Sequence, residues 1–99
     1  MLFVVVYKPR ENWSEELQQR TLQLFTQWQP PAGLEFKAHY AHADGSGGVA
    51  VVAVSDAAAL VEGIEPFSAS FAFDATPVVE MAEAVPLMQR AQAWRASTR

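Results

Sequence analysis

The sequence contains no cysteine, and this absence excludes several kinds of chemistry. Without thiols the chain has no disulfide framework, no thiolate metal site and no cysteine nucleophile. Long apolar runs are also absent: the apolar segment at residues 1–7 ends at Lys8 and Pro9, well short of the ~20 residues of a transmembrane helix. The same segment lacks the charged start and the small-residue cleavage site of a secretory signal. We therefore expect a cytoplasmic protein that does not bind membranes.

Basic residues are scarce as well. The chain has 7 Lys and Arg against 11 Asp and Glu, which gives a net charge of −4. Nucleic-acid binding depends on clustered basic side chains that neutralise phosphates, so no nucleic-acid partner is expected. An RNA-recognition module would also need exposed aromatic and basic residues on its third strand, and the corresponding residues 48–54 have neither.

Apolar residues are what the chain has in excess. Of its 99 residues, 51% are hydrophobic and 18% are charged, whereas an average globular domain has about 45–50% and about 25%. A chain of this length forms one domain with a limited core. Apolar surface beyond the needs of that core usually marks an interface, so we expect a homodimer.

Four strands are predicted from the pattern of apolar residues. Residues 2–7 and 49–54 are almost entirely apolar, which is typical of central strands buried on both faces. Residues 34–41 alternate, as a strand with two unlike faces does, and a glycine-rich hairpin at 44–48 connects them to the next strand. Residues 67–79 form the fourth strand region, in which apolar and polar side chains alternate again.

The first helix is predicted over residues 13–28. Apolar side chains recur there at helical spacing, and the intervening glutamines and arginine form a polar face. Asn12 is the expected N-cap, with Glu15 as its capping-box partner.

Two further helices follow. A short one is predicted at residues 57–61, capped by Ser55 or Asp56. A C-terminal helix is predicted at residues 83–96, with Pro86 in its first turn.

The resulting order is βαββαβ with an extra C-terminal helix, the ferredoxin-like arrangement of the α+β class. We expect a single domain over residues 1–99, with its core in residues 1–80. This fold places two helices on one face of a four-stranded antiparallel sheet. The other face can stay in contact with water only if it is polar, and the first and third strands are apolar on both sides. A second subunit, the C-terminal helix, or both should therefore cover it.

Several segments connect this order with known proteins. They are the opening MLFVV, the PAGL before the second strand, the Asp44-Gly45 hairpin, Asp56 with Leu60, and FAFDATPV in the fourth strand. On these residues, over about residues 1–80, the chain resembles the dimeric α/β-barrel superfamily, which includes antibiotic-biosynthesis-type monooxygenases and muconolactone-isomerase-like proteins. More narrowly, it resembles a family of short bacterial proteins known only as a domain of unknown function. The resemblance implies a ferredoxin-like fold and a homodimer, and it implies no activity.

The two histidines are the first candidates for chemistry. His39 and His42 are residue types that bind metals and transfer protons. Positions three apart on a strand point to opposite faces, so the two rings cannot hold one ion unless the strand bulges. A surface or interface histidine is therefore the favoured interpretation, and no metal site is expected.

A more specific hypothesis places residues of the second and fourth strands in one cavity. By alternation, Glu35, Lys37 and His39 share one side of their strand, and Asp74 can face the same cavity from the fourth strand. A His and an Asp in an apolar pocket have shifted pKa values and can move a proton. The candidate catalytic residues are His39, Asp74, Tyr7 and Lys37. Because the two strands lie at opposite edges of a ferredoxin-like sheet, charges that discourage edge aggregation are the favoured alternative.

No motif in the sequence indicates a cofactor. The glycine-rich residues 45–48 lack the Lys and Ser/Thr of a phosphate loop, and they precede a strand instead of a helix. No serine lies in a G-x-S-x-G elbow. We therefore expect neither a cofactor nor nucleophilic catalysis.

Three functions remain open. The preferred one is a homodimer that binds a small apolar ligand between the sheet and its covering elements, as the resemblance implies. The first alternative is a cofactor-free oxygenase or isomerase in the same pocket, which requires titratable groups inside it. The second is an interaction or assembly module, with a filled interior and an exposed apolar patch at residues such as Leu22.

Overall fold

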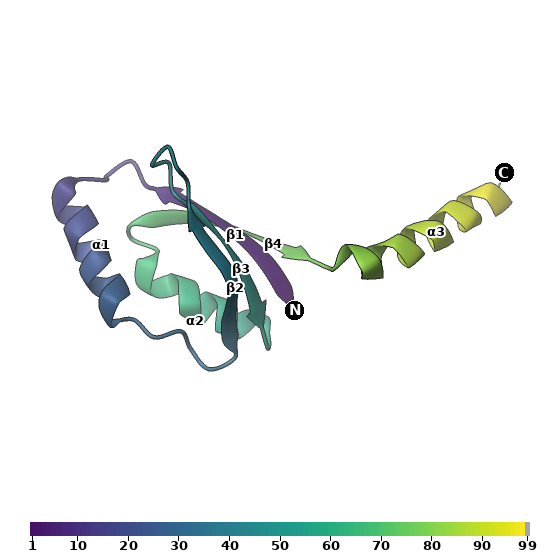
Figure 1. Cartoon of the computed structure of the whole chain (residues 1–99), viewed down its shortest axis with the longest axis horizontal. Helices are drawn as coiled ribbons and strands as arrows, with labels where there is room; N and C mark the ends of the chain where they lie inside the picture. The colour runs from purple at the N-terminus through teal and green to yellow at the C-terminus, as the bar shows by residue number, and fades with distance from the viewer. Residues whose placement is uncertain (99) are drawn as a thin grey trace.

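The fold is the predicted α+β arrangement. A computed structural model describes residues 1–98 of the chain. The elements are β1 (Leu2–Pro9), α1 (Glu15–Gln27), β2 (Leu34–Ala41), β3 (Gly48–Val54), α2 (Ala57–Ile64), the 3-10 helix η1 (Glu65–Phe67), β4 (Phe71–Val78) and α3 (Met81–Ser97). Their order, βαββαβα, confirms the ferredoxin-like prediction (Figure 1).

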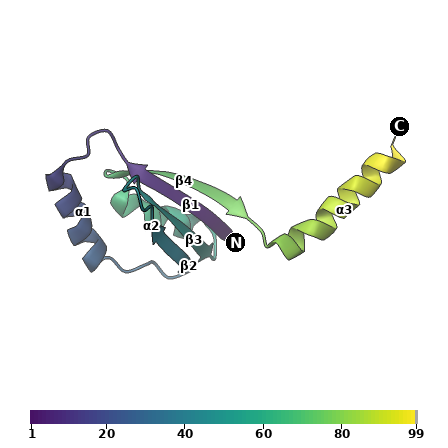
Figure 2. The same cartoon turned by 45° about the horizontal axis from the view of Figure 1, so that its top comes forward.

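The four strands form one antiparallel sheet in the order β2-β3-β1-β4. The two strands without polar alternation, β1 and β3, are central, because only a strand with neighbours and covering layers on all sides can bury apolar residues on both faces. The amphipathic strands β2 and β4 are at the edges (Figure 2). These placements confirm the positions predicted from the apolar pattern.

The core lies between α2 and one face of the sheet, called here the helix face. On that face β1 contributes Phe3 and Val5, and β3 contributes Ala50, Val52 and Val54, all buried. Two residues of α2, Ala59 and Leu60, pack against them. The helix is held in place at its start by Asp56, whose Oδ1 accepts a hydrogen bond of 3.0 Å from the amide of Ala59. Of the two predicted caps, Asp56 is therefore the one used.

Helix α1 begins later than predicted. Its N-cap is Ser14, not Asn12: Ser14 Oγ accepts a hydrogen bond of 3.1 Å from the Leu17 amide. One residue of α1, Thr21, is buried. Its hydroxyl donates to the Leu17 carbonyl at 2.7 Å and lies 2.8 Å from Ser70 Oγ, which precedes β4. This contact anchors the middle of α1, which otherwise stands off the sheet as a separate layer (Figure 1).

The fourth strand is shorter than predicted. It begins at Phe71, because residues 65–67 form η1, with Pro66 in its first turn. The strand region starting at residue 67 is therefore wrong at its N-terminal end. The turn closes through a hydrogen bond of 3.1 Å from the Ser70 amide to the Phe67 carbonyl.

Helix α3 extends away from the rest of the chain (Figures 1 and 2). It starts at Met81, two residues before the predicted start, so Pro86 lies in its second turn and not in the first. None of the described residues of α3 is buried. The radius of gyration is 17.7 Å, against roughly 13 Å for a compact domain of this length. The helix therefore covers neither face of its own sheet. Within residues 1–98, no helix combines the length and the apolar character needed to cross a membrane.

Candidate ligand-binding cavity

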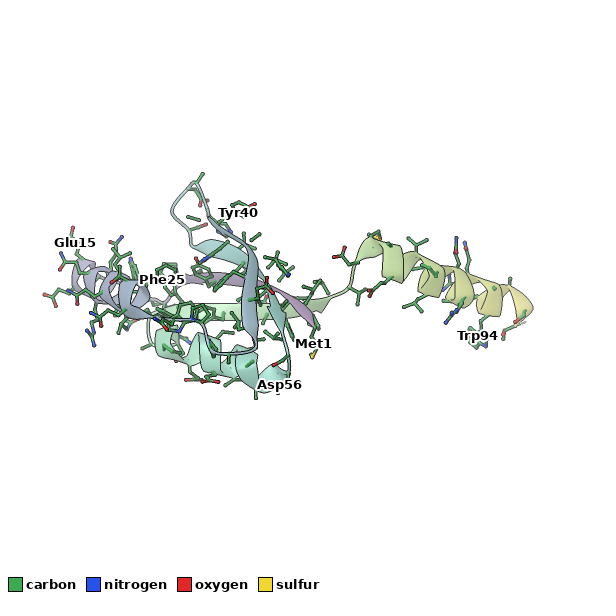
Figure 3. All side chains as sticks on the ribbon, turned by 60° about the horizontal axis from the view of Figure 1, so that its bottom comes forward. Met1, Glu15, Phe25, Tyr40, Asp56 and Trp94 are labelled. Atoms are coloured by element: carbon green, nitrogen blue, oxygen red, sulfur yellow. The ribbon has the colours of Figure 1, made fainter. Side chains whose placement is uncertain are left out.

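A cavity of about 370 Å³ lies between the helix face of the sheet and the two helices α1 and α2. Its floor is formed by Val5 of β1 and by Ala50 and Val52 of β3. Figure 3 shows Phe25 on the side of α1 that faces the sheet. The remaining lining residues are Tyr7, Thr21, Leu22, Trp28, Leu34, Phe36, His39, Tyr40, Ala41, Leu60, Gly63, Ile64, Phe67, Phe71 and Phe73.

Aromatic rings form most of the cavity wall. Trp28 packs edge-on against Phe67 from η1 and Phe36 from β2, with ring centroids 5.3 and 6.0 Å apart and interplanar angles of 84° in both pairs. Phe25 lies 6.0 Å from Phe67. Edge-to-face contacts of this kind stabilise aromatic clusters beyond simple burial. The rings therefore form a defined wall around the cavity.

One pair of polar side chains meets at this wall. Tyr7 Oη lies 2.7 Å from His39 Nε2, a hydrogen bond between two residues 32 positions apart. Tyr7 is on β1 and His39 is on β2, and β3 runs between these strands. The tyrosine therefore reaches across a whole strand to contact the histidine.

Gly48 of β3 makes this reach possible. It is buried and pairs with Tyr7 across the β1–β3 ladder. A Cβ atom at this position would collide with Oη and Cζ of Tyr7. A glycine inside a strand often marks such a close approach, and here the missing side chain lets the tyrosine ring lie over the β3 backbone.

A β-bulge in β2 turns His39 towards the cavity. Phe36 pairs with Val52, but Ala38 pairs with the very next residue, Val51, so Lys37 is an extra residue in the ladder. After the bulge, His39 pairs with Ala50 and shares the helix face with Phe36. The two rings stack with centroids 5.1 Å apart at 15°. The prediction that Glu35, Lys37 and His39 share one side is therefore wrong, because strict alternation does not survive a bulge.

The other candidate residues lie outside the cavity. Lys37 Nζ forms an exposed ion pair of 3.3 Å with Glu35 Oε1. Asp74 pairs with Val6, while Tyr7 pairs with Phe73. Because paired residues share a face, Asp74 lies on the sheet face opposite the cavity. The hypothesis that His39 and Asp74 face one cavity is therefore wrong for a single chain.

The second histidine does not join the first. His42 Nδ1 lies 3.0 Å from Ser46 Oγ, within the β2–β3 turn, whereas His39 contacts Tyr7. Among residues 1–98, no group of three or more His, Asp and Glu side chains is arranged to hold a metal ion.

Burial favours the neutral form of both members of the Tyr7–His39 pair. It raises the pKa of Tyr7 and lowers the pKa of His39, since removal from water penalises the charged form of each group. His39 is nevertheless exposed, so the pair lies at the mouth of the cavity and not at its floor. A neutral pair of this kind can donate or accept hydrogen bonds, and the neutral imidazole can act as a base.

Sequence reasoning identified Tyr7 and His39 as separate candidates but missed their contact. It also missed Gly48, which was interpreted as part of the hairpin turn. A glycine at the start of an otherwise apolar strand was an available signal for close packing. No signal in residues 34–41 marks the bulge, because it depends on how β2 pairs with β3.

Comparison with known proteins assigns the chain to a family. No curated protein and no solved structure matches it. A family model described as a domain of unknown function, DUF3303, matches residues 1–92. The match covers the entire sheet, α1, α2 and most of α3. The chain therefore belongs to the DUF3303 family.

Proposed function

We propose that this protein binds one small, largely apolar molecule in the cavity between its sheet and helices. The observation that carries the proposal is the cavity itself. Protein cores pack as densely as organic crystals, with few voids larger than a water molecule. A domain of 99 residues has little core to spare, yet about 370 Å³ lies beside its buried strands. Ligand pockets occupy about 300–1,000 Å³, so this volume suits a small ligand.

The covering helix supports the same proposal. Two large apolar residues of α1, Leu22 and Phe25, line the cavity, yet they are 59% and 47% exposed. A purely structural helix would bury such residues against the sheet. Their position at the rim is consistent with side chains that complete their contacts on a bound ligand.

The test fills the cavity with a larger side chain on its floor. In Ala50→Leu, the larger side chain projects into the cavity; in Ala53→Leu, the same change lies on the opposite face of β3. Both proteins are titrated with benzene, naphthalene and indole, and amide shifts are followed by NMR. We expect shifts at cavity residues in the wild type and in Ala53→Leu, and their loss in Ala50→Leu. If no member of the panel shifts the cavity residues of the wild type, the proposal fails.

A second candidate function is cofactor-free chemistry in the same cavity, as an isomerase or oxygenase. The observation that favours it is the Tyr7–His39 hydrogen bond of 2.7 Å, a pair of titratable groups at the cavity mouth. A neutral imidazole can accept a proton from a carbon acid. The test is deuterium exchange from solvent into 2-tetralone, whose protons beside the carbonyl are mobile. Exchange faster than in buffer, abolished in His39→Gln, favours the enzyme; exchange at the buffer rate favours binding alone.

We also propose that the binding protein is a homodimer. The sheet face opposite the cavity, called here the open face, carries partly exposed apolar residues of β1 and β3: Leu2, Val4, Val6, Val49, Val51 and Ala53. Helix α3 exposes a second apolar set: Met81, Val85, Leu87, Met88 and Trp94, the last labelled in Figure 3. Helices in proteins draw most of their stability from packing against other elements, and no described residue of α3 is buried within the chain. A second copy of the chain supplies apolar surface that covers both the open face and α3.

The dimer is tested by sedimentation equilibrium of the full chain and of a chain lacking residues 81–99. We expect a dimer at micromolar concentration and weaker association after the deletion. A monomeric full chain would overturn this part of the proposal. The remaining alternative, an assembly module, requires a filled interior, and the cavity argues against it.

A further inference from the structure

We infer that the Tyr7–His39 pair selects a neutral, ring-containing ligand that carries one hydroxyl or carbonyl group. This inference rests on the proposed ligand-binding function and defines the class of ligand. It is built from the polar groups of the cavity, from their free hydrogen-bonding capacity and from the absence of charge on the lining.

Four residues with polar side chains contribute to the lining of the cavity: Tyr7, Thr21, His39 and Tyr40. The hydroxyl of Thr21 is already engaged by the Leu17 carbonyl and by its serine partner. Tyr40 pairs with Val49, so its side chain belongs to the open face, and 66% of the residue is exposed to solvent. Among the lining residues that the structure describes, the Tyr7–His39 pair is therefore the polar group placed to recognise a ligand.

The pair can serve a ligand as donor or as acceptor. If Nε2 of His39 accepts a hydrogen bond from the Tyr7 hydroxyl, Tyr7 Oη keeps a lone pair that can accept a hydrogen bond from a ligand hydroxyl. If Nε2 carries its own proton and donates, the Tyr7 O–H is free to donate to a ligand carbonyl. A change of imidazole tautomer is enough to switch between the two. Hydroxyl and carbonyl groups are therefore the ligand groups that match.

Charge on the ligand is disfavoured. Within residues 1–98, no Asp, Glu, Lys or Arg lines the cavity, and burial favours the neutral forms of Tyr7 and His39. A carboxylate or ammonium group would lose hydration without gaining a counter-charge. The aromatic wall, with Phe25, Phe36 and Phe67, instead offers faces and edges for a flat ring.

The geometry also gives the ligand an orientation. His39 is exposed at the mouth of the cavity, whereas Leu60, Phe67 and Val52 are buried. The ring system enters first and lies against these buried side chains. The single polar group then stays beside the Tyr7–His39 pair.

The experiment uses three probes with the same ring system: naphthalene, 1-naphthol and 1-naphthoate. Affinities are measured by NMR titration of the full chain at neutral pH. We expect 1-naphthol to bind about five- to tenfold more tightly than naphthalene, the effect of one added hydrogen bond. We expect 1-naphthoate to bind more weakly than 1-naphthol, because its carboxylate loses hydration without gaining a counter-charge.

Two matched variants locate the effect. Tyr7→Phe removes one hydroxyl and keeps the ring, and should lower the affinity for 1-naphthol to that for naphthalene while leaving naphthalene binding unchanged. Tyr40→Phe is the control: it makes the same change on the open face, where the hydroxyl does not meet a ligand in the cavity, and should keep the full preference. Thermal unfolding of both variants checks that each is folded.

The outcomes separate this inference from the proposed function. If naphthalene binds but 1-naphthol binds no more tightly, the inference is overturned and ligand binding stands. The same holds if 1-naphthoate binds as tightly as 1-naphthol, or if Tyr7→Phe keeps the preference. If none of the three probes binds, the proposed function fails, and this inference fails with it.

Discussion

Replacing Gly48 with alanine is expected to displace Tyr7 and break its hydrogen bond to His39. The added Cβ would occupy the space of Oη and Cζ of Tyr7 and would lie 2.9 Å from the carbonyl oxygen of Tyr40. The backbone of the central strand β3 cannot move aside without disturbing its pairing with β1 and β2. The ring of Tyr7 must therefore rotate away. The substitution therefore acts on the candidate site and on stability together.

The magnitude follows from three contributions. Overpacking costs about 1–3 kcal/mol, and loss of the Tyr7–His39 hydrogen bond costs about 0.5–1.5 kcal/mol. Alanine recovers about 0.5–1 kcal/mol because it has less backbone freedom than glycine in the unfolded chain. The free energy of unfolding should therefore fall by about 2 kcal/mol.

A double-mutant cycle measures how much of this cost comes from the tyrosine. Urea unfolding is compared for the wild type, Gly48→Ala, Tyr7→Ala and the double variant. In the Tyr7→Ala background the ring is gone, and Gly48→Ala should cost at least 1 kcal/mol less, as expected for residues in contact. Some cost remains in both backgrounds because the Tyr40 carbonyl is unchanged. Equal costs in the two backgrounds would refute the view that Gly48 makes room for Tyr7.

Three further predictions concern stability and assembly. Burial lowers the pKa of His39. The stability that its neutral ring contributes should therefore be complete above about pH 6.5, the pKa of an unfolded histidine, and should be lost as the pH falls through the lower pKa of the folded state. When urea midpoints are plotted against pH, His39→Gln should flatten this fall, and an unchanged curve would contradict the prediction. Thr21→Val removes a buried hydrogen bond and leaves its serine partner unsatisfied, so it should cost about 1–3 kcal/mol. The control Thr26→Val, whose hydroxyl bond is exposed, should stay within about 0.5 kcal/mol, and equal costs by urea unfolding would count against the anchor of α1. Val51→Lys on the open face should weaken the dimer in sedimentation equilibrium, whereas Val61→Lys on the exposed side of α2 should not; equal effects would exclude the open face as the interface.

Much of the fold could be predicted from local patterns. Residues 2–7 and 49–54 carry apolar side chains on both sides, and such strands are stable only at the centre of a covered sheet. The alternation in β2 and β4 predicted two strands with unlike faces, and the ferredoxin-like order then placed both strands at the edges of the sheet. The errors were at helix and strand ends, at Ser14, Phe71 and Met81, where several neighbouring residues can serve as the boundary.

The candidate site was predictable only in part. Alternation places Phe73 and Asp74 on opposite sides of their strand, but the sequence does not say which of these two residues points towards the helices. The ladder between β1 and β4 decides this, and it places Asp74 on the open face. Tyr7 and His39 could be named as candidates, but their contact depends on the strand order.

The class of fold, the central strands, the lack of cysteine chemistry and an apolar interior could all be read from the amino-acid sequence. They follow from composition and from periodicities that act over a few residues. The geometry of the site, in contrast, depends on how the strands pair. The bulge at Lys37 is a mismatch between two strands, and the clearance at Gly48 matters only because Tyr7 lies opposite. Both are properties of pairing between distant segments, so no local pattern encodes them.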